Sequence, residues 1–401
     1  MVFKNAVGIN RQDHLKKLVM ALIFVVLFST NTCANSWVEL IDKKIGFQET
    51  QAITVDEQGY IYLAGTGYNV VSKFTPATEE DWIIKKFDPN GVEVDFGGGG
   101  LQDCTLNLDA GAKCTNNNLD LVFDGNGDKD EIFDIKYYQG HIYVIGYGRR
   151  LVSDTSADDW WIKRFDTSGN EVQFNDGKQA SCGSLGTGAN CTLSSSDLVY
   201  DGSGKNDRAH EIEFYNNTIY VAGFGEELVW SSKEDGWIKS FNTSGYETDF
   251  GGSVKTNCES TVNPPCTSNN KDYVLDASYG TDKVHDLVVD KFGNINVVGE
   301  SENLISTVSN ADAWVKQISN SGSLNWNNSF DSENGNDYFY GVATDNQANI
   351  YVAGSGANLT TGSSTVDAMI FKYDSTGSFD SAWNKRIDNG GFDRFYSVDV
   401  S

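Results

Sequence analysis

Histidine and basic residues are scarce in this sequence, and these shortages exclude several classes of protein. Four histidines in 401 residues leave few ligands for a metal site built on imidazole. Lysine and arginine together number 30, against 56 aspartates and glutamates, and the formal net charge of −26 excludes a surface that tracks nucleic-acid phosphates. The acidity instead favours solubility in a salty or calcium-rich exterior. We therefore expect no nucleic-acid partner.

Long apolar runs are scarce as well, and the prominent one is LVMALIFVVLF at residues 18–28, which follows a basic stretch. It is too short to anchor the chain in a bilayer, and small residues follow it, as in a secretory signal. We predict a signal peptide over residues 1–34, no transmembrane span, and export to the periplasm, the extracellular space or the cell surface. The alternative is a lipoprotein acylated at Cys33, although the residues before Cys33 make a poor lipobox.

The few cysteines come as near neighbours once Cys33 is set aside. Similar short spacings of 10, 9 and 8 residues indicate local disulfides in an oxidising compartment, because zinc would require tighter pairs and nearby histidine. The three predicted bonds are Cys104 to Cys114, Cys182 to Cys191, and Cys258 to Cys266.

A phrase that begins with aspartate, continues with apolar residues and ends in a turn occurs five times. The copies begin at residues 81, 158, 235, 312 and 367 and read DWIIKKFDPNG, DDWWIKRFDTSG, DGWIKSFNTSG, DAWVKQISNSG and DAMIFKYDSTG. A hairpin pattern such as IEFYNNTIYVAGFG precedes each copy, and a further short strand follows it. No segment shows helical periodicity. Each repeat is therefore expected to form four antiparallel strands.

Repeated four-stranded units predict an all-β fold of the β-propeller class, in which each blade is stable only between neighbours. The expected complete blades cover residues 51–124, 131–201, 210–276, 284–331 and 339–388, within a propeller domain at 35–401. Lone strands at 36–42 and 395–400 would share a sixth, incomplete blade. The pattern indicates a piece of a longer protein with six or seven blades, or alternatively a ring that closes imperfectly.

The runs GYGRRLVSDTSADDWWIKRFDTSG, NIYVAGSG and FDSENGNDYFYGVATD carry a resemblance to a known repeat. The chain resembles SBBP-type bacterial β-propeller repeat proteins over nearly all of its length after residue 36. The resemblance implies an exported bacterial protein with a propeller fold and implies little about activity. The cysteine-bearing insertions between the third and fourth strands depart from the simple repeat.

The loops between the second and third strands are long in every repeat. Loops on a rigid scaffold often carry binding residues, so we expect these loops to form a recognition surface. Packing of the loops onto the core is the alternative for their aliphatic residues. The GxG in these loops precedes no helix and is therefore no phosphate cradle. The most informative side chains are Tyr68, Tyr147, Arg149, Arg150, Phe224 and Trp230.

Trp82 and Trp160 begin the third strand of the first two repeats. The equivalent residues are Gly236, Ala313 and Ala368, so the position accepts side chains of very different size. This variability predicts that the two tryptophans are exposed candidates for ligand binding, whereas Trp161 is expected in the core.

The turn before each first strand is rich in aspartate. Asp124, Asn126, Asp128 and Asp130 alternate as the ligands of a short calcium loop do, and calcium is the one cofactor that the sequence suggests. Turn and strand capping by the same carboxylates is the alternative.

Ionisable or phenolic residues follow these turns and are expected at the mouth of a central channel. They are Glu131, His210, His285, Tyr340 and Tyr396. Acid and base chemistry is possible there, with His210, His285 and Glu131 as weak catalytic candidates.

The first hypothesis is a non-enzymatic scaffold that binds a protein or a glycan. The alternatives are a hydrolase or lyase acting at the channel mouth, and a purely structural cell-surface repeat.

Overall fold

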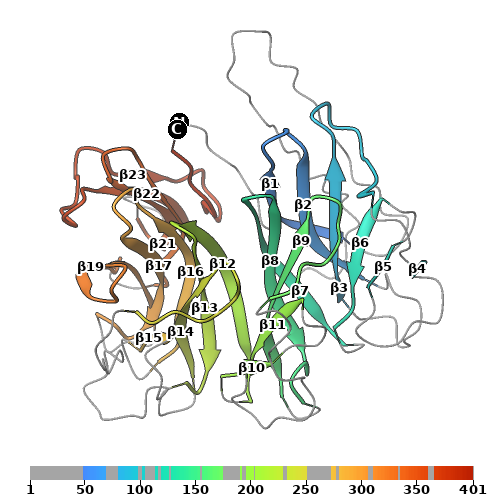
Figure 1. The fold of residues 1–401 in the computed structure, drawn as a ribbon. Helices are drawn as coiled ribbons and strands as arrows, with labels where there is room; N and C mark the ends of the chain where they lie inside the picture. The colour runs from blue at the N-terminus through green and yellow to red at the C-terminus, as the bar shows by residue number, and fades with distance from the viewer. Residues whose placement is uncertain are drawn as a thin grey trace. The chain divides into compact units, whose positions relative to one another are not determined.

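The computed structural model contains strands and turns and, in the residues that it describes, no helix. Its strands form five sheets, each built on four antiparallel strands (Figure 1). This confirms the all-β prediction and the blade-like sheets of a β-propeller. The structure describes residues 48–68, 80–97, 102–103, 113–115, 119–125, 128–153, 156–174, 190–191, 196–202, 204–228, 233–250, 272–276, 280–305, 310–332, 335–359 and 365–400.

The first two sheets carry short additional strands beside the basic four. The first sheet has the order β1-β2-β3-β6-β5-β4 and the second β10-β11-β9-β8-β7. The strands of the first sheet are β1 (Gln48–Val55), β2 (Ile61–Tyr68), β3 (Glu80–Phe87), β4 (Gln102–Asp103), β5 (Lys113–Thr115) and β6 (Asp120–Phe123). Those of the second are β7 (Asp130–Tyr138), β8 (His141–Arg149), β9 (Asp158–Asp166), β10 (Asn190–Cys191) and β11 (Asp197–Tyr200).

The last three sheets follow the order of the chain. The third comprises β12 (Asp207–Tyr215), β13 (Thr218–Glu226), β14 (Glu234–Asn242) and β15 (Asp272–Leu275). The fourth comprises β16 (Asp282–Val289), β17 (Ile295–Glu302), β18 (Ala311–Ile318) and β19 (Leu324–Phe330). The fifth comprises β20 (Tyr338–Thr344), β21 (Ile350–Ala357), β22 (Val366–Tyr373) and β23 (Lys385–Ile387).

The chain divides into two compact units, and each is described by itself. The smaller unit comprises residues 6–142 and 165–170, and the larger comprises residues 1–5, 143–164 and 171–401. The first sheet belongs to the smaller unit, and the third, fourth and fifth sheets belong to the larger one. The site described below lies within the larger unit.

Successive sheets of the larger unit share hydrophobic cores, as the repeat pattern requires. Trp314 of the fourth sheet lies in one cluster with Tyr220 and Ile238 of the third. Val298 and Val315 of the fourth sheet lie in another cluster with residues of the fifth. Because each sheet buries apolar side chains on both faces, it is stabilised by both of its neighbours.

The turns that close the third strands follow from their sequence. Asp166 Oδ1 accepts hydrogen bonds from the N–H groups of Ser168 (2.9 Å) and Asn170 (2.8 Å), which is an Asx turn. Gly169 has φ of 76°, a conformation that favours glycine. Asp88, Asn242, Ser319 and Asp374 accept equivalent bonds in the other repeats.

The expectation that Trp82 and Trp160 are exposed is wrong, because both side chains are 0% exposed. Trp160 Nε1 donates to the Phe224 carbonyl at 3.0 Å, and its ring lies 4.5 Å from that of Trp237. The position holds glycine in the next repeat, where a Cβ on Gly236 would lie 3.0 Å from Leu275 and 3.2 Å from Val284. Trp161 is buried as expected, at 2% exposure.

The two ends of the chain were expected to share a blade. Residues 1–47, with the predicted signal peptide and the strand at 36–42, lie outside the described residues. Residues 395–400 form no named strand, but Val398 packs in a cluster with Ala343 and Ile370 of the fifth sheet. No helix in the described part of the chain is long and apolar enough to span a membrane.

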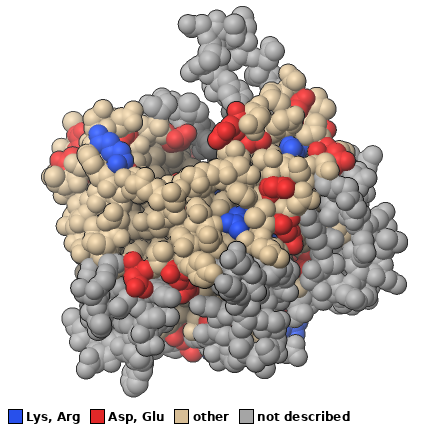
Figure 2. Space-filling model, in the orientation of Figure 1, with Lys and Arg blue, Asp and Glu red and all other residues tan. Residues whose placement is uncertain are grey.

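The acidity of the sequence is visible on the described surface. Figure 2 shows acidic side chains at several places in this view and few basic ones, in keeping with the net charge of −26.

Candidate functional site

Four ring-bearing side chains lie in a continuous row across the larger unit, and we call them the ring row. They are His210 on β12, His285 on β16, Tyr340 on β20 and Tyr396 in the C-terminal segment. The ring centroids are 6.3 Å apart from His210 to His285, 5.2 Å from His285 to Tyr340, and 5.2 Å from Tyr340 to Tyr396. All four residues are partly exposed, although Nε2 of His210 and Nε2 of His285 are buried. The structure thus brings together four of the five residues expected at the channel mouth.

A β-bulge places three members of the ring row. The pairing of β12 with β13 skips His210, that of β16 with β17 skips His285, and that of β20 with β21 skips Tyr340. A bulge residue is left out of the ladder, and its side chain can be redirected relative to the strand. The same irregularity therefore recurs in successive repeats and presents a different side chain each time.

The first glycine of each GxG makes this bulge possible. A Cβ on Gly223 would lie 2.0 Å from the Arg208 carbonyl oxygen, and one on Gly354 would lie 1.9 Å from that of Tyr338. Gly299 stands in the same relation to the Lys283 carbonyl, at 1.8 Å. Only glycine permits so close an approach of the two backbones. The GxG is thus a strand motif that supports the site.

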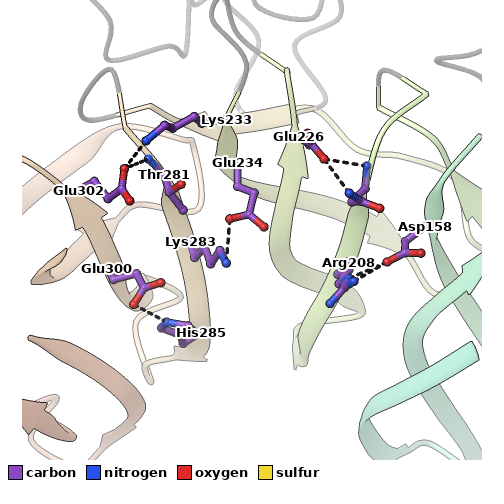
Figure 3. Close-up of polar contacts among 11 residues, drawn as sticks. Asp158, Arg208, Glu226, Lys233, Glu234, Thr281, Lys283, His285, Glu300 and Glu302 are labelled. Atoms are coloured by element: carbon purple, nitrogen blue, oxygen red, sulfur yellow. Dashed lines mark hydrogen bonds and ion pairs between the residues drawn. The ribbon is translucent and has the colours of Figure 1, made fainter. Parts of the chain in front are cut away.

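Ion pairs lie on the same strands as the two histidines of the row, near its histidine end (Figure 3). The Arg208 guanidinium contacts Asp158 Oδ2 at 2.5 Å, and Lys283 Nζ lies 2.7 Å from Glu234 Oε2. His285 Nε2 lies 3.5 Å from Glu300 Oε2, a contact drawn in the same view. Arg208 and Lys283 lie two residues before His210 and His285. A lysine or arginine with an acidic partner therefore precedes each histidine on its strand.

Two members of the row, His210 and Tyr340, have pKa values shifted so that they stay neutral. Burial lowers the pKa of His210 well below 6.5, and the charges of His285, Arg208 and Lys283 lower it further. Burial raises the pKa of Tyr340, against the opposing charge of Arg394, so its phenol stays protonated. At neutral pH the row therefore offers a neutral imidazole and a phenolic donor.

The remaining channel-mouth candidate, Glu131, was assigned to the wrong register. The Gly125 N–H donates to Asp130 Oδ2 at 2.5 Å, just as the Gly202 N–H donates to Asp207 Oδ2 at 2.7 Å. Asp130 is therefore the equivalent of Asp207, and Phe133 is the equivalent of His210. Glu131 lies in the smaller unit, where its carboxylate is 2.8 Å from Lys129 Nζ.

Two of the residues expected to form a recognition surface are buried beneath the ring row. Tyr147 is 0% exposed under the Arg208 guanidinium, which lies 4.5 Å from its ring. Phe224 is 3% exposed, with its ring 5.4 Å from that of His210. Both support residues of the site and are not available to a ligand.

The other residues predicted for the recognition surface are either exposed arginines or lie outside what the structure describes. Arg149 and Arg150 are exposed, and Arg150 has φ of 57°. The side chain of Tyr68, and Trp230 as a whole, lie outside what the structure describes.

The predicted disulfides also fall largely outside the described residues. Cys114 is completely buried in β5 and is disulfide-bonded. Its expected partner Cys104 is not among the described residues, so all three pairings stay predictions.

The calcium candidates are only partly brought together. Oxygens of Asp124 and Asp130 lie within 4.8 Å of one another and of an oxygen of Asp81, which the sequence reasoning missed. Asp128 is not in this group, and its Oδ1 accepts the Lys129 N–H at 3.0 Å. Asn126 lies outside the described residues. Asp81 could have been found, because the same aspartate opens every third strand.

Comparisons with known proteins find only distant likenesses. No family model matches the chain, so its membership of the SBBP-type repeat proteins stays a prediction, and no curated protein matches it. A protein of unknown function from Bacteroides caccae is 10% identical with a TM-score of 0.39, covering 90% of this chain and 89% of that one.

Two solved enzymes are similarly remote. An ulvan lyase is 12% identical with a TM-score of 0.44, covering 84% of this chain and 70% of that one. A xylan β-1,4-xylosidase from Bacillus halodurans is 10% identical with a TM-score of 0.34, covering 88% and 57%. Likenesses at this level assign no activity to the chain.

Proposed function

We propose that the chain is an exported, non-enzymatic binding protein whose ring row recognises a glycan. The observation that carries the proposal is the unbroken succession of four partly exposed rings, each from a different repeat or segment. A linear ligand with repeating units fits a linear array of this kind. A globular protein partner would instead require a larger contact area, about 800 Å² on each partner.

The chemistry of the row suits a carbohydrate. Tyrosine offers an apolar face for the C–H surface of a sugar ring and a hydroxyl for its polar edge. Tyr338 stacks on Tyr340 with ring centroids 5.5 Å apart and 16° between planes, which widens this platform. His285, Glu300 and Arg208 supply donors and acceptors for hydroxyl groups.

A glycan array tests the proposal directly. The full chain should retain one class of oligosaccharide, and the double variant His285→Ala, Tyr340→Ala should lose at least tenfold in affinity for it. The control is Tyr246→Ala, which removes a tyrosine that is 44% exposed in the turn after β14. Binding that responds equally to both variants, or no retained glycan at all, would refute the proposal.

One observation favours a second function, that of a hydrolase or lyase. His285 Nε2 and Glu300 Oε2 are 3.5 Å apart, and a small side-chain shift would bring the carboxylate within reach to orient the imidazole as a base. Turnover of the retained glycan that is abolished by His285→Ala and also by His210→Ala would establish the enzyme. Retention without turnover leaves the binding protein.

A further inference from the structure

Three aspartates recur in each repeat, one at the start of a third strand and two in the turn that leads to the next first strand. We call them the aspartate triads. In chain order they are Asp81, Asp124 and Asp130; Asp159, Asp201 and Asp207; Asp235, Asp276 and Asp282; Asp312, Asp331 and Asp337; and Asp367, Asp388 and Asp393. They share no residue with the ring row.

In four of these aspartates, Asp159, Asp207, Asp312 and Asp337, one carboxylate oxygen caps a turn or loop. Asp207 Oδ2 accepts the Gly202 N–H at 2.7 Å, and Asp337 Oδ2 accepts the Ser332 N–H at 2.7 Å. Asp159 Oδ2 accepts the N–H of Leu151 at 2.7 Å and that of Val152 at 3.1 Å. Asp312 Oδ2 accepts the Ile305 N–H at 2.8 Å. These bonds are the capping role expected from sequence.

Capping leaves the other oxygen of these aspartates unexplained. Asp159, Asp207, Asp312 and Asp337 are each 0% exposed, and the Oδ1 atom of each is buried without a hydrogen-bond donor. The Glu226 N–H, near Asp207, donates instead to the Asn206 carbonyl at 2.9 Å. No described lysine or arginine forms an ion pair with any of the four. Buried carboxylate oxygens without a partner are costly unless a cation or a proton compensates them.

The first and third triads show the spacing of a shared ligand, which the second and fourth, with their unpartnered oxygens, do not reach. In the first and in the third, one oxygen from every aspartate lies within 4.8 Å of the other two. Oxygens that bind one calcium ion at about 2.3 to 2.6 Å lie no more than about 5 Å apart. Capping needs no such convergence.

The second glycine of GxG keeps room for the same carboxylates. A Cβ on Gly225 would lie 2.5 Å from Asp207 Oδ1, and one on Gly356 would lie 2.1 Å from Asp337 Oδ1. Both glycines are therefore required by the position of the unpartnered oxygen. The third triad differs, because Ser301 stands at this position opposite Asp282.

We propose that each of the first four aspartate triads binds one calcium ion. The donors are all oxygens, and three aspartates can supply several of the six to eight ligands that calcium takes. Magnesium is less suited, because it demands near-ideal octahedral geometry and keeps several waters. The capping oxygens fix the carboxylates, and the Oδ1 atoms provide ligands.

The fifth triad differs and serves as a natural control. Asp388 is exposed, and Asp393 is only partly buried. Both oxygens of Asp393 face Asn389, whose N–H donates to Oδ2 at 2.7 Å and whose side-chain amide lies 3.4 Å from Oδ1. We expect no calcium there.

Elemental analysis of the full chain after dialysis against micromolar calcium tests the inference without any variant. The expected result is about four calcium ions per chain and a thermal midpoint that rises from chelator to millimolar calcium. No bound calcium, together with identical melting curves in chelator and calcium, would overturn the proposal. Equal occupancy by magnesium in a competition dialysis would overturn the choice of metal.

Variants locate the ions. Asp207→Asn and Asp337→Asn keep an oxygen that can accept the capping N–H but remove the charge, and each should lower the calcium content by about one. Asp393→Asn, the same change in the fifth triad, should leave it unchanged. An unaltered calcium content in the double variant Asp207→Asn, Asp337→Asn would place the ions elsewhere and contradict the assignment.

Discussion

The ring row and the aspartate triads lie in the same repeats but differ in how much their residue types vary from repeat to repeat. At the bulge position the residue changes from histidine to tyrosine along the larger unit, whereas every triad position holds aspartate. The backbone is the same in both, because the same bulge recurs in the third, fourth and fifth sheets. The constant positions thus hold the turns and the proposed cations, and the varying positions face a ligand.

Variation alone does not mark a recognition site, and Trp160 shows why. Its position varies as much as that of the ring row, but Trp160 is completely buried. Partial exposure combined with variation distinguishes the ring row from packing positions.

The largest effect is expected from Trp160→Ala. The substitution leaves a cavity beside Trp237 and removes the hydrogen bond to Phe224, so the free energy of unfolding should fall by about 4 kcal/mol. Urea denaturation measures it. Phe392→Ala, at a side chain 77% exposed, should cost at most about 0.5 kcal/mol. A small loss at Trp160 would return that residue to the list of binding candidates.

Lys239→Ala sharpens the contrast between buried carboxylates with and without a cation of their own. Lys239 is 2% exposed, contacts Asp272, and lies 3.0 Å from Glu247. Removing it takes a cation away from two largely buried carboxylates, and we expect a loss of about 3 kcal/mol in unfolding free energy. Lys205→Ala, at an exposed pair 3.8 Å from Glu227, should change stability by less than about 0.5 kcal/mol.

A smaller effect is expected from acid, through His210. Burial keeps its folded-state pKa well below 6.5, so the unfolded chain takes up the proton first. The stability contributed by neutral His210 is present above pH 6.5 and is lost as pH falls below that value, by on the order of 1 kcal/mol. The groups that face it are Arg208, Phe224, Lys283 and His285.

The matched variant for the acid test is His210→Phe, which places the residue of the second repeat at this position. Denaturation of both proteins between pH 7 and pH 5 should give a steeper loss for the native chain. Parallel curves would show that His210 does not titrate as described.

The sequence predicts much of the fold because its signals are local. Asx turns such as that at Asp166 and the hairpin phrases each depend on a few neighbouring residues. The burial of Trp160 could not be predicted, because its partner Trp237 belongs to another sheet. For the same reason the sequence suggested His210 and His285 as separate candidates without showing that their rings are neighbours.

The triads show a second limit of the sequence. Asp124 and Asp130 were recognisable from their turn, but Asp81 joins them from the third strand, about 40 residues earlier in the chain. Alternating acidic residues in one loop therefore suggested Asp128, whereas the fold selects an aspartate from a neighbouring strand.

The most direct test of the central claim is the affinity of Tyr340 variants for the glycan retained by the full chain, measured by titration calorimetry. Tyr340 contacts ring-row members on both sides, so Tyr340→Ala should weaken binding at least tenfold with little change in stability. Tyr340→Phe keeps the ring and should retain most of the affinity. Equal affinity of the native chain and Tyr340→Ala would contradict the assignment of the ring row as the binding site.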